Sequence, residues 1–332
     1  MTDIKIYNKE ALQHLLDDVP SDSVDLILTD PPYITSRDSG MQKWREKKEK
    51  KKFTSMTEEQ WKAFKTMSEW KEFLRKEKKP AKSIKTRLQA YKKNYLKCGS
   101  IYGDKYAIAT DYGSWDSEFT VEALGDIVEQ FYRVLRPGGT CIIFFDLWKI
   151  TNLKSLMENC GPTRIRKDKE TGETREVTSG FKQLRFIEWI KTNPVPINSK
   201  CNYLTNAREI ALGAVKKGSC TFHSQYDNAI YKYPIYGGKD RFHPTQKSLP
   251  LFEELIRKHS NEGDLVLDTF LGSGTTAVAA LNTNRKFIGC ELSEEYYNKS
   301  LDRVKEYEIS MRQSLEAELA VIQKRLEKFK TQ

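Results

Sequence analysis

The sequence has few of the features that place a chain in a membrane, at a metal ion or outside the cell. No apolar run approaches the roughly 18 residues of a membrane span, and the first residues, Met1–Ile4, do not form a signal peptide. The four histidines lack ligand spacing, so we expect no metal site. The six cysteines show no paired spacing, which predicts reduced thiols in the cytoplasm of a bacterium or of a virus's host cell.

Apolar residues are also scarce, at 38% of the chain against 31% charged residues. The 15 Phe, 16 Tyr and 6 Trp nevertheless argue against general disorder. A chain of 332 residues can bury a large core, and we expect one catalytic domain over residues 1–332. A Gly-, Tyr- and Ser-rich segment at 216–242 reads as a loop that contributes to target recognition.

The positive charge is concentrated in one segment. Residues 41–97 hold 20 Lys and Arg but only 7 Asp and Glu, whereas the whole chain has a net charge of +10. We therefore predict a basic helical insertion at 38–100 that contacts a polyanion. Its first helix opens with the capping-box pattern of Thr57 and Gln60. The aromatic and apolar positions that follow at helical spacing are Trp61, Phe64, Met67, Trp70 and Phe73. The alternative is a solvated helical lid without a partner.

The stretch Asp25–Tyr33 organises the rest of the chain. Leu26, Ile27 and Leu28 are typical of a buried parallel strand. The pair Pro31-Pro32 ends that strand, because proline offers no N–H to a neighbouring strand. The sequence thus predicts a carboxylate, a carbonyl and an aromatic ring at the carboxyl end of a strand, which is where ligands bind in open α/β sheets.

These groups suit a planar ring that carries an amino group. The Asp30 carboxylate and the Pro31 carbonyl can each accept one N–H of an exocyclic amine, and Tyr33 can stack on the ring. With both protons held, the nitrogen lone pair is free to attack an electrophile. The alternative is an Asp-Pro turn after a strand, with Tyr33 as a packing residue.

A second motif lies near the carboxyl end of the chain. A predicted strand ends at Asp268, the glycine loop 269–274 follows, and a helix begins near Thr275. The next strand ends at Glu291. This is a nucleotide-type βαβ unit, in which glycines let a ligand approach the backbone and the acid accepts ribose hydroxyls. The pattern also fits NAD, but no Lys follows the glycines, so it is not a P-loop.

From Ser293 to about Lys330 the chain reads as one long charged helix. Its apolar residues Leu315, Leu319, Ile322, Leu326 and Phe329 repeat at 4-3-4-3 spacing. Two arrangements fit this repeat: the helix packs on its own domain, or it pairs with a second copy of the chain in a homodimer.

Taken together, the motifs resemble those of S-adenosylmethionine-dependent DNA amino-methyltransferases of the beta arrangement, in which the catalytic motif precedes the cofactor motif. The similarity covers nearly the whole chain outside 38–100. The matching segments are Ser23–Tyr33, Arg133–Gly139, Trp189–Pro194, His243–Lys247, Asp268–Thr276 and Ile288–Glu291. The resemblance implies a Rossmann-like α/β fold with a seven-stranded, mostly parallel sheet, flanking helices and one antiparallel strand.

The resemblance also implies roles for individual residues. The target amine would be bound by Asp30 and Pro31, within a catalytic motif that includes Pro32, and Tyr33 would stack on the flipped base. The cofactor loop would comprise Asp268, Phe270, Gly272, Ser273, Gly274 and Thr275. Glu291 would hold the ribose, and Thr245, Gln246 and Lys247 would lie along the methionine moiety.

Two positions depart from the family pattern. Ser248 stands where the family usually has Pro, which perturbs a helix start. Tyr7-Asn8 replaces a common Gly-Asp, so Asn8 is a weak candidate for contacting the adenine of the cofactor.

The predicted function is methylation of adenine N6 in double-stranded DNA, because Asp in the first motif position favours adenine in this family. Cytosine N4 is the alternative, since either amine satisfies the same two acceptors. More remote alternatives are an NAD-dependent oxidoreductase and a catalytically silent DNA-binding protein.

Overall fold

The computed structural model describes residues 3–32, 56–65, 89, 91–93, 95–96, 119–167, 174–194, 207–238, 241–243 and 245–330. Contacts divide the chain into two compact units. The sheet unit comprises Met1–Ile34 and Ser114–Gln332, and the insertion unit comprises Thr35–Gly113.

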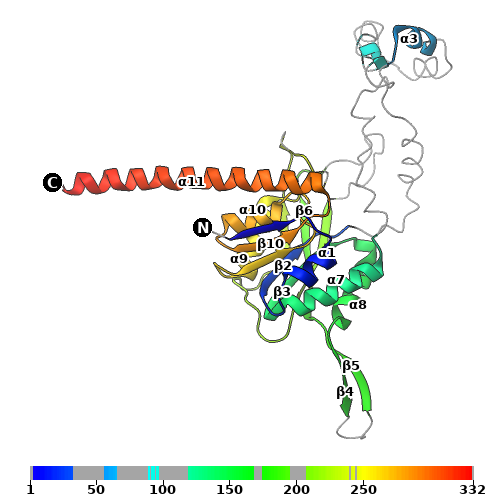
Figure 1. Cartoon of the computed structure of the whole chain (residues 1–332), viewed down its shortest axis with the longest axis vertical. Coiled ribbons are helices and arrows are strands. Elements are labelled where there is room, and N and C mark those ends of the chain that lie inside the picture. Colours follow the sequence, from blue (N-terminus) through cyan, green and yellow to red (C-terminus); the bar gives the residue numbers. More distant parts are fainter. Residues whose placement is uncertain are drawn as a thin grey trace. The chain divides into compact units, whose positions relative to one another are not determined.

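The sheet unit is built on one sheet of eight strands in the order β1-β10-β9-β2-β3-β7-β6-β8. Figure 1 shows this sheet with helices packed around it. In that order the strands span Ile4–Tyr7, Lys286–Cys290, Leu265–Asp268, Val24–Thr29, Leu135–Phe145, Arg208–Val215, Lys182–Lys191 and Ile230–Tyr233. All are parallel except β7, which runs antiparallel to both of its neighbours, β3 and β6. The predicted fold class is confirmed.

The sheet has eight described strands rather than seven, because β8 joins its outer edge beside β6. This strand is only four residues long and lies within 216–242, which the sequence predicted as a loop. A second sheet of two short strands, β4 (Thr163–Lys167) and β5 (Thr174–Thr178), forms a hairpin that the sequence did not predict. The sequences of β8 and of the β4–β5 hairpin lack the long alternation of apolar and polar residues that would predict a strand.

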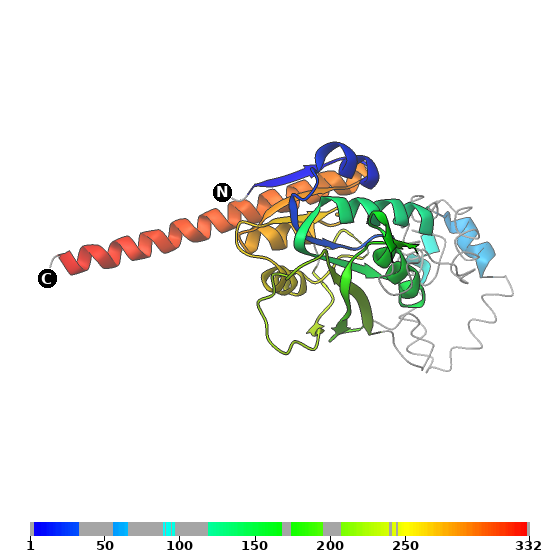
Figure 2. The same ribbon diagram turned by 90° about the horizontal axis from the view of Figure 1, so that it is seen from below.

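Helices cover both faces of the main sheet (Figure 2). On one face lie α1 (Ala11–Asp18), α7 (Val121–Val134) and α8 (Ile150–Asn159), which follows the short helix η2 (Leu147–Lys149). On the other lie α9 (Leu249–His259), α10 (Thr275–Asn282) and the first turns of α11 (Glu294–Lys330).

Successive residues of the central strands point to opposite faces of the sheet and pack into the apolar cores on those two faces. Ile27 packs with the α1 and α7 side, whereas Leu26 and Leu28 pack with the α9 and α10 side. In β3 the same alternation places Ile143 on the first face and Ile142 on the second. Burial on both faces explains why these strands read as continuous apolar runs.

The four cysteines that the structure describes are free, and Cys141, Cys160 and Cys290 are buried. Burial raises the pKa of Cys160 to about 12, so this thiol is protonated at neutral pH. Within the described part of the chain, no helix has the length and apolarity needed to cross a membrane. That part also holds no group of three or more His, Cys, Asp or Glu arranged for a metal ion.

The distal half of α11 carries the predicted heptad repeat. Leu315, Leu319 and Ile322 are 54%, 56% and 52% exposed, so this part of the helix does not pack into the core of the sheet unit. Pairing of the repeat with a second copy of the chain stays a prediction.

In the insertion unit, helix α3 spans Glu58–Phe64 and begins with the predicted capping box of Thr57 and Gln60. Trp61 is only 3% exposed, and its ring centroid lies 5.3 Å from that of Tyr95. Phe64 stacks on the same tyrosine at 4.6 Å. The aromatic residues of α3 therefore pack against a second segment of the insertion itself. The predicted continuation of this helix, Met67 to Phe73, lies outside the described residues.

Candidate active site

Two motifs that are far apart in the sequence meet at the carboxyl edge of the sheet. Strand β2 ends at Thr29 and its neighbour β9 ends at Asp268, so the residues after each strand emerge side by side. The Thr29 hydroxyl donates a buried hydrogen bond of 2.6 Å to Oδ1 of Asp268. The Asp30 motif and the glycine loop therefore lie at neighbouring strand ends, and Thr29 links β2 to Asp268 directly.

Asp30 follows β2, with Pro31 buried and Pro32 half-buried behind it. Its Oδ2 lies 2.8 Å from Nζ of Lys247, and the Asp30 side chain is 19% exposed. The strand ends where the two prolines predicted it would end. Tyr33, the fourth residue of the motif, lies outside the described residues.

Lys247 also lies 2.5 Å from Oε2 of Glu209, at the start of β7. The other carboxylate oxygen of Glu209 lies 2.6 Å from Nζ of Lys191, at the end of β6. Burial raises the pKa of Glu209, but the two ammonium groups outweigh burial and hold that pKa below its ordinary value. Glu209 is therefore ionised at neutral pH. We call Asp30, Lys247, Glu209 and Lys191 the charge row.

The glycine loop has the backbone conformation that the motif requires. Gly272 has φ +54° and Gly274 has φ +75°, both in the left-handed region that favours glycine. A Cβ atom on Gly272 would lie 3.3 Å from the ring of His243. Gly274 caps the N-terminus of α10. The loop thus brings its backbone and a helix start to the same edge of the sheet as Asp30.

Glu291, the first residue after β10, lies directly beside this loop. Its Oε2 accepts the N–H of Gly272 at 2.8 Å, and its Oε1 accepts the N–H of Ser293 at 2.9 Å. Burial raises the pKa of Glu291, and the backbone donors oppose that rise. The acid therefore lies where the βαβ pattern predicted it.

Asp268 is buried beneath the loop rather than exposed at its surface. Its oxygens accept the Thr29 hydroxyl, the Phe270 N–H at 3.0 Å and the Thr276 hydroxyl at 2.5 Å. Burial raises its pKa above the ordinary value. Asp268 thus shapes the loop through internal hydrogen bonds.

Ser273 and Thr275 are also buried, and Arg303 of α11 binds both of them. The guanidinium donates to the Ser273 carbonyl at 2.8 Å and to the Thr275 hydroxyl at 3.1 Å. The sequence did not predict these two hydrogen bonds. Arg303 lies in a helix with many charged residues, and nothing in the pattern distinguishes it from the others. Phe270 packs edge-on against Phe119 at 5.6 Å.

The segment before α9 lines the other side of the loop. Gln246 and Lys247 are buried and Thr245 is exposed. The pKa of His243 falls to about 4 because of burial and the nearby Lys247 and Arg241, so its ring is neutral at physiological pH. Its Nδ1 lies 3.1 Å from the Thr245 hydroxyl.

The two departures from the family pattern have local consequences. Helix α9 begins at Leu249 with a proline in its first two positions, so the proline-marked start is kept despite Ser248. The side-chain amide of Asn8 donates to the carbonyls of Glu291 and Leu292 at 2.8 and 3.1 Å. Asn8 therefore links the end of β1 to the residues after β10 by hydrogen bonds.

These features fit S-adenosylmethionine. The loop adopts a left-handed backbone at Gly272 and Gly274, and the N-terminus of a helix lies next to it. Glu291 can accept further hydrogen bonds through its remaining lone pairs. The fold and this site define an S-adenosylmethionine-dependent methyltransferase.

Comparison with known proteins narrows the class. A family model for N6 and N4 methyltransferases, described as "DNA methylase", matches residues 24–302. The chain is 32% identical over 211 residues to Type II methyltransferase M2.DpnII of Streptococcus pneumoniae, covering 57% of this chain and 70% of that protein. It is 30% identical over 208 residues to Type II methyltransferase M2.LlaDCHI of Lactococcus lactis subsp. cremoris, with the same coverage of both chains. The chain therefore belongs to the N6/N4 family of DNA methyltransferases.

Solved structures share its fold. PvuII DNA methyltransferase (cytosine-N4-specific) superposes with a TM-score of 0.54 at 15% identity, covering 92% of both chains. The M1.HpyAVI–SAM complex superposes with a TM-score of 0.51 at 22% identity, covering 91% of this chain and 98% of that one. None of these comparisons supports the alternative that the chain is an NAD-dependent oxidoreductase.

The glycine loop gives the first test. We expect Gly272→Val to abolish S-adenosylmethionine binding measured by calorimetry, because the side chain would meet His243 and fill the ligand's space. Gly263→Val is the matched control. Gly263 also has a positive φ, of +82°, but nothing lies within 4 Å of its Cβ position. Both variants carry the backbone cost of about 1–2 kcal/mol, so unchanged cofactor affinity in Gly272→Val would show that the loop does not bind the cofactor.

Proposed function

We propose that this DNA methyltransferase transfers the methyl group of S-adenosylmethionine to the N6 amine of adenine at a specific site in double-stranded DNA. The observation that carries the proposal is the place of Asp30 and Pro31, at the end of β2 and joined through Thr29 to the cofactor loop. The family is shared by adenine N6 and cytosine N4 enzymes. The Asp at the first motif position favours adenine by resemblance, and cytosine N4 is the second candidate.

In the proposed mechanism the target base leaves the duplex stack, since its amine is inaccessible inside the duplex. The Asp30 carboxylate and the Pro31 carbonyl each accept one N–H of the amine and direct the nitrogen lone pair. The cofactor supplies an electrophilic methyl group on a sulfonium. When the nitrogen bonds to the methyl carbon, the carbon–sulfur bond breaks and a neutral thioether would leave. The Asp30 carboxylate stabilises the positive charge that the nitrogen gains and accepts the proton that the nitrogen then loses. Stacking on Tyr33 would return about 1–3 kcal/mol of the cost of unstacking.

The role of Asp30 is tested by its removal. We expect Asp30→Ala to lower kcat by at least about 10²-fold, while S-adenosylmethionine affinity stays within about tenfold because the cofactor loop is unchanged. Single-turnover methyl transfer and calorimetry measure the two effects separately. Asp30→Asn, which keeps the shape but not the charge, should be similarly impaired. Wild-type turnover in either variant would rule out the proposed role.

The target base is identified directly. Duplex DNA methylated by the purified protein is digested to nucleosides and analysed by mass spectrometry, and we expect N6-methyladenine. N4-methylcytosine instead would establish the second candidate. Absence of any methylated nucleoside would favour a catalytically silent DNA-binding protein. Sequencing that maps modified bases would then give the recognition site.

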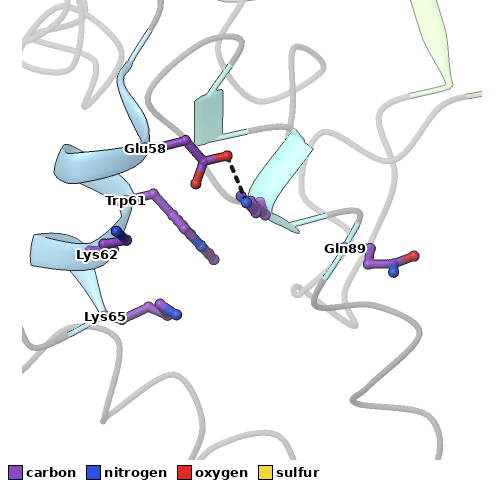
Figure 3. Close-up of a pocket in the computed structure, with 6 residues that line it drawn as sticks. Glu58, Trp61, Lys62, Lys65 and Gln89 are labelled. Atoms are coloured by element: carbon purple, nitrogen blue, oxygen red, sulfur yellow. Dashed lines mark ion pairs between the residues drawn. The ribbon is translucent and has the colours of Figure 1, made fainter.

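The insertion unit is the proposed site of phosphate contact. Lys62, Lys65 and Lys92 line a hollow of about 280 Å³ together with Glu58, Trp61 and Gln89 (Figure 3). Lys92 forms an ion pair with Glu58 at 2.7 Å. Lys62 and Lys65 are both exposed on the surface around Trp61. Lysines on one surface are the usual means of binding phosphates.

We expect Lys62→Gln/Lys65→Gln to weaken duplex binding and to flatten the dependence of log K on log salt concentration by about 0.9 per lost phosphate contact. The matched control is Lys217→Gln/Lys286→Gln, which removes the same charge from two exposed lysines at the amino edge of the sheet. Fluorescence anisotropy at several salt concentrations measures both. Equal slopes in the two double variants would identify the insertion as a solvated lid.

A further inference from the structure

The charge row places a buried ammonium group between two carboxylates. Lys247 has a side chain only 8% exposed, and its Nζ lies 2.8 Å from Asp30 and 2.5 Å from Glu209. The resemblance implied that Lys247 lies along the methionine moiety of the cofactor. The structure instead directs its ammonium group at the residue proposed to bind the target amine.

The four members of the row come from four separate segments. Asp30 follows β2, Lys247 precedes α9, Glu209 is the second residue of β7 and Lys191 is the last residue of β6. Glu209 accepts from both lysines at 2.5 and 2.6 Å, so it draws part of the Lys247 charge away from Asp30. A buried ammonium shared in this way both neutralises and orients the carboxylates that it binds.

We propose that Lys247 and Glu209 are positioning residues for methyl transfer: Lys247 keeps Asp30 ionised and fixes the direction of its carboxylate, and Glu209 keeps Lys247 from neutralising Asp30 fully. The inference rests on the proposed role of Asp30. In the part of the chain that the structure describes, Lys247 from the segment before α9 pairs with Asp30, and Glu209 of β7 and Lys191 of β6 extend this chain of ion pairs. The Asp268 carboxylate of β9 binds the hydroxyl of Thr29, the residue before Asp30.

The test is a double-mutant cycle with pH profiles. Lys247→Met leaves Asp30 and Glu209 close together without their shared cation, so one of them retains a proton to higher pH. We expect the acid limb of kcat to move up by about 1–3 pH units. Glu209→Gln leaves Lys247 bound to Asp30 alone and should lower kcat without changing cofactor affinity.

In the double variant Glu209→Gln/Lys247→Met, the second carboxylate is gone, so Asp30 regains its ionisation at lower pH. We expect the acid limb to return toward its wild-type position and kcat to exceed that of Lys247→Met. A coupling of about 2- to 150-fold is usual for residues in one network. If Lys247 served the cofactor, the double variant would bind S-adenosylmethionine as weakly as the single variant.

The structure offers a matched control. Lys258 also bridges two carboxylates, those of Asp227 at 2.7 Å and Glu254 at 2.6 Å, away from the carboxyl edge of the sheet. Lys258→Met should lower the melting temperature but leave the pH profile of kcat unchanged. Glu209→Gln changes little in shape, so it serves as the folded variant if Lys247→Met is unstable.

The outcomes separate this inference from the proposed function. An unshifted acid limb in Lys247→Met, with no recovery in the double variant, would overturn the positioning role even if Asp30→Asn is inactive. Loss of S-adenosylmethionine binding in Lys247→Met, with kcat unchanged at saturating cofactor, would overturn it in favour of a cofactor contact. Wild-type turnover in Asp30→Asn would instead remove the proposed function on which the inference rests.

Discussion

The site depends on one buried hydrogen bond, from the Thr29 hydroxyl to the Asp268 carboxylate. The two residues end neighbouring parallel strands, so this bond holds together the segment that would bind the target amine and the loop that would bind the cofactor. Asp268 is 3% exposed and accepts three hydrogen bonds, which compensate its burial. A direct transfer between two bound groups needs such fixed placement, because positioning supplies much of the catalysis.

The antiparallel strand has a specific consequence for the site. Because β7 runs opposite to its neighbours, its first residues lie at the carboxyl edge of the sheet, where the other strands end. Glu209 is the second residue of β7 and is paired in register with Trp189 of β6. The reversal thus brings a carboxylate next to Lys191, at the end of β6, and within reach of Lys247.

Sequence reasoning succeeded where local chemistry decides the structure. The prolines after Thr29 ended β2, the glycines gave positive φ angles, and the acid after β10 came beside the loop. Sequence reasoning missed two kinds of contact. One depends on whether a distant strand runs parallel or antiparallel, and the other depends on which side chains of a charged helix point toward the site. Lys191 lay in a segment that matched the family but had no assigned role, Glu209 read as the start of an apolar run, and Arg303 as one charge among many. An acid and a lysine flanking two neighbouring apolar strands were the available signal for the charge row.

The acids of the site are held in two different ways. Among the described residues, Asp268 and Glu291 next to the glycine loop accept hydrogen bonds from N–H and O–H donors. Asp30 and Glu209 instead share the ammonium group of Lys247, and Glu209 also pairs with Lys191. Burial raises the pKa of the first two acids, and the lysines lower that of Glu209. Burial thus works against ionisation of Asp268 and Glu291, and the N–H and O–H donors that bind them oppose this effect. The charge row is balanced, so its part in the reaction is to fix direction rather than to add net charge.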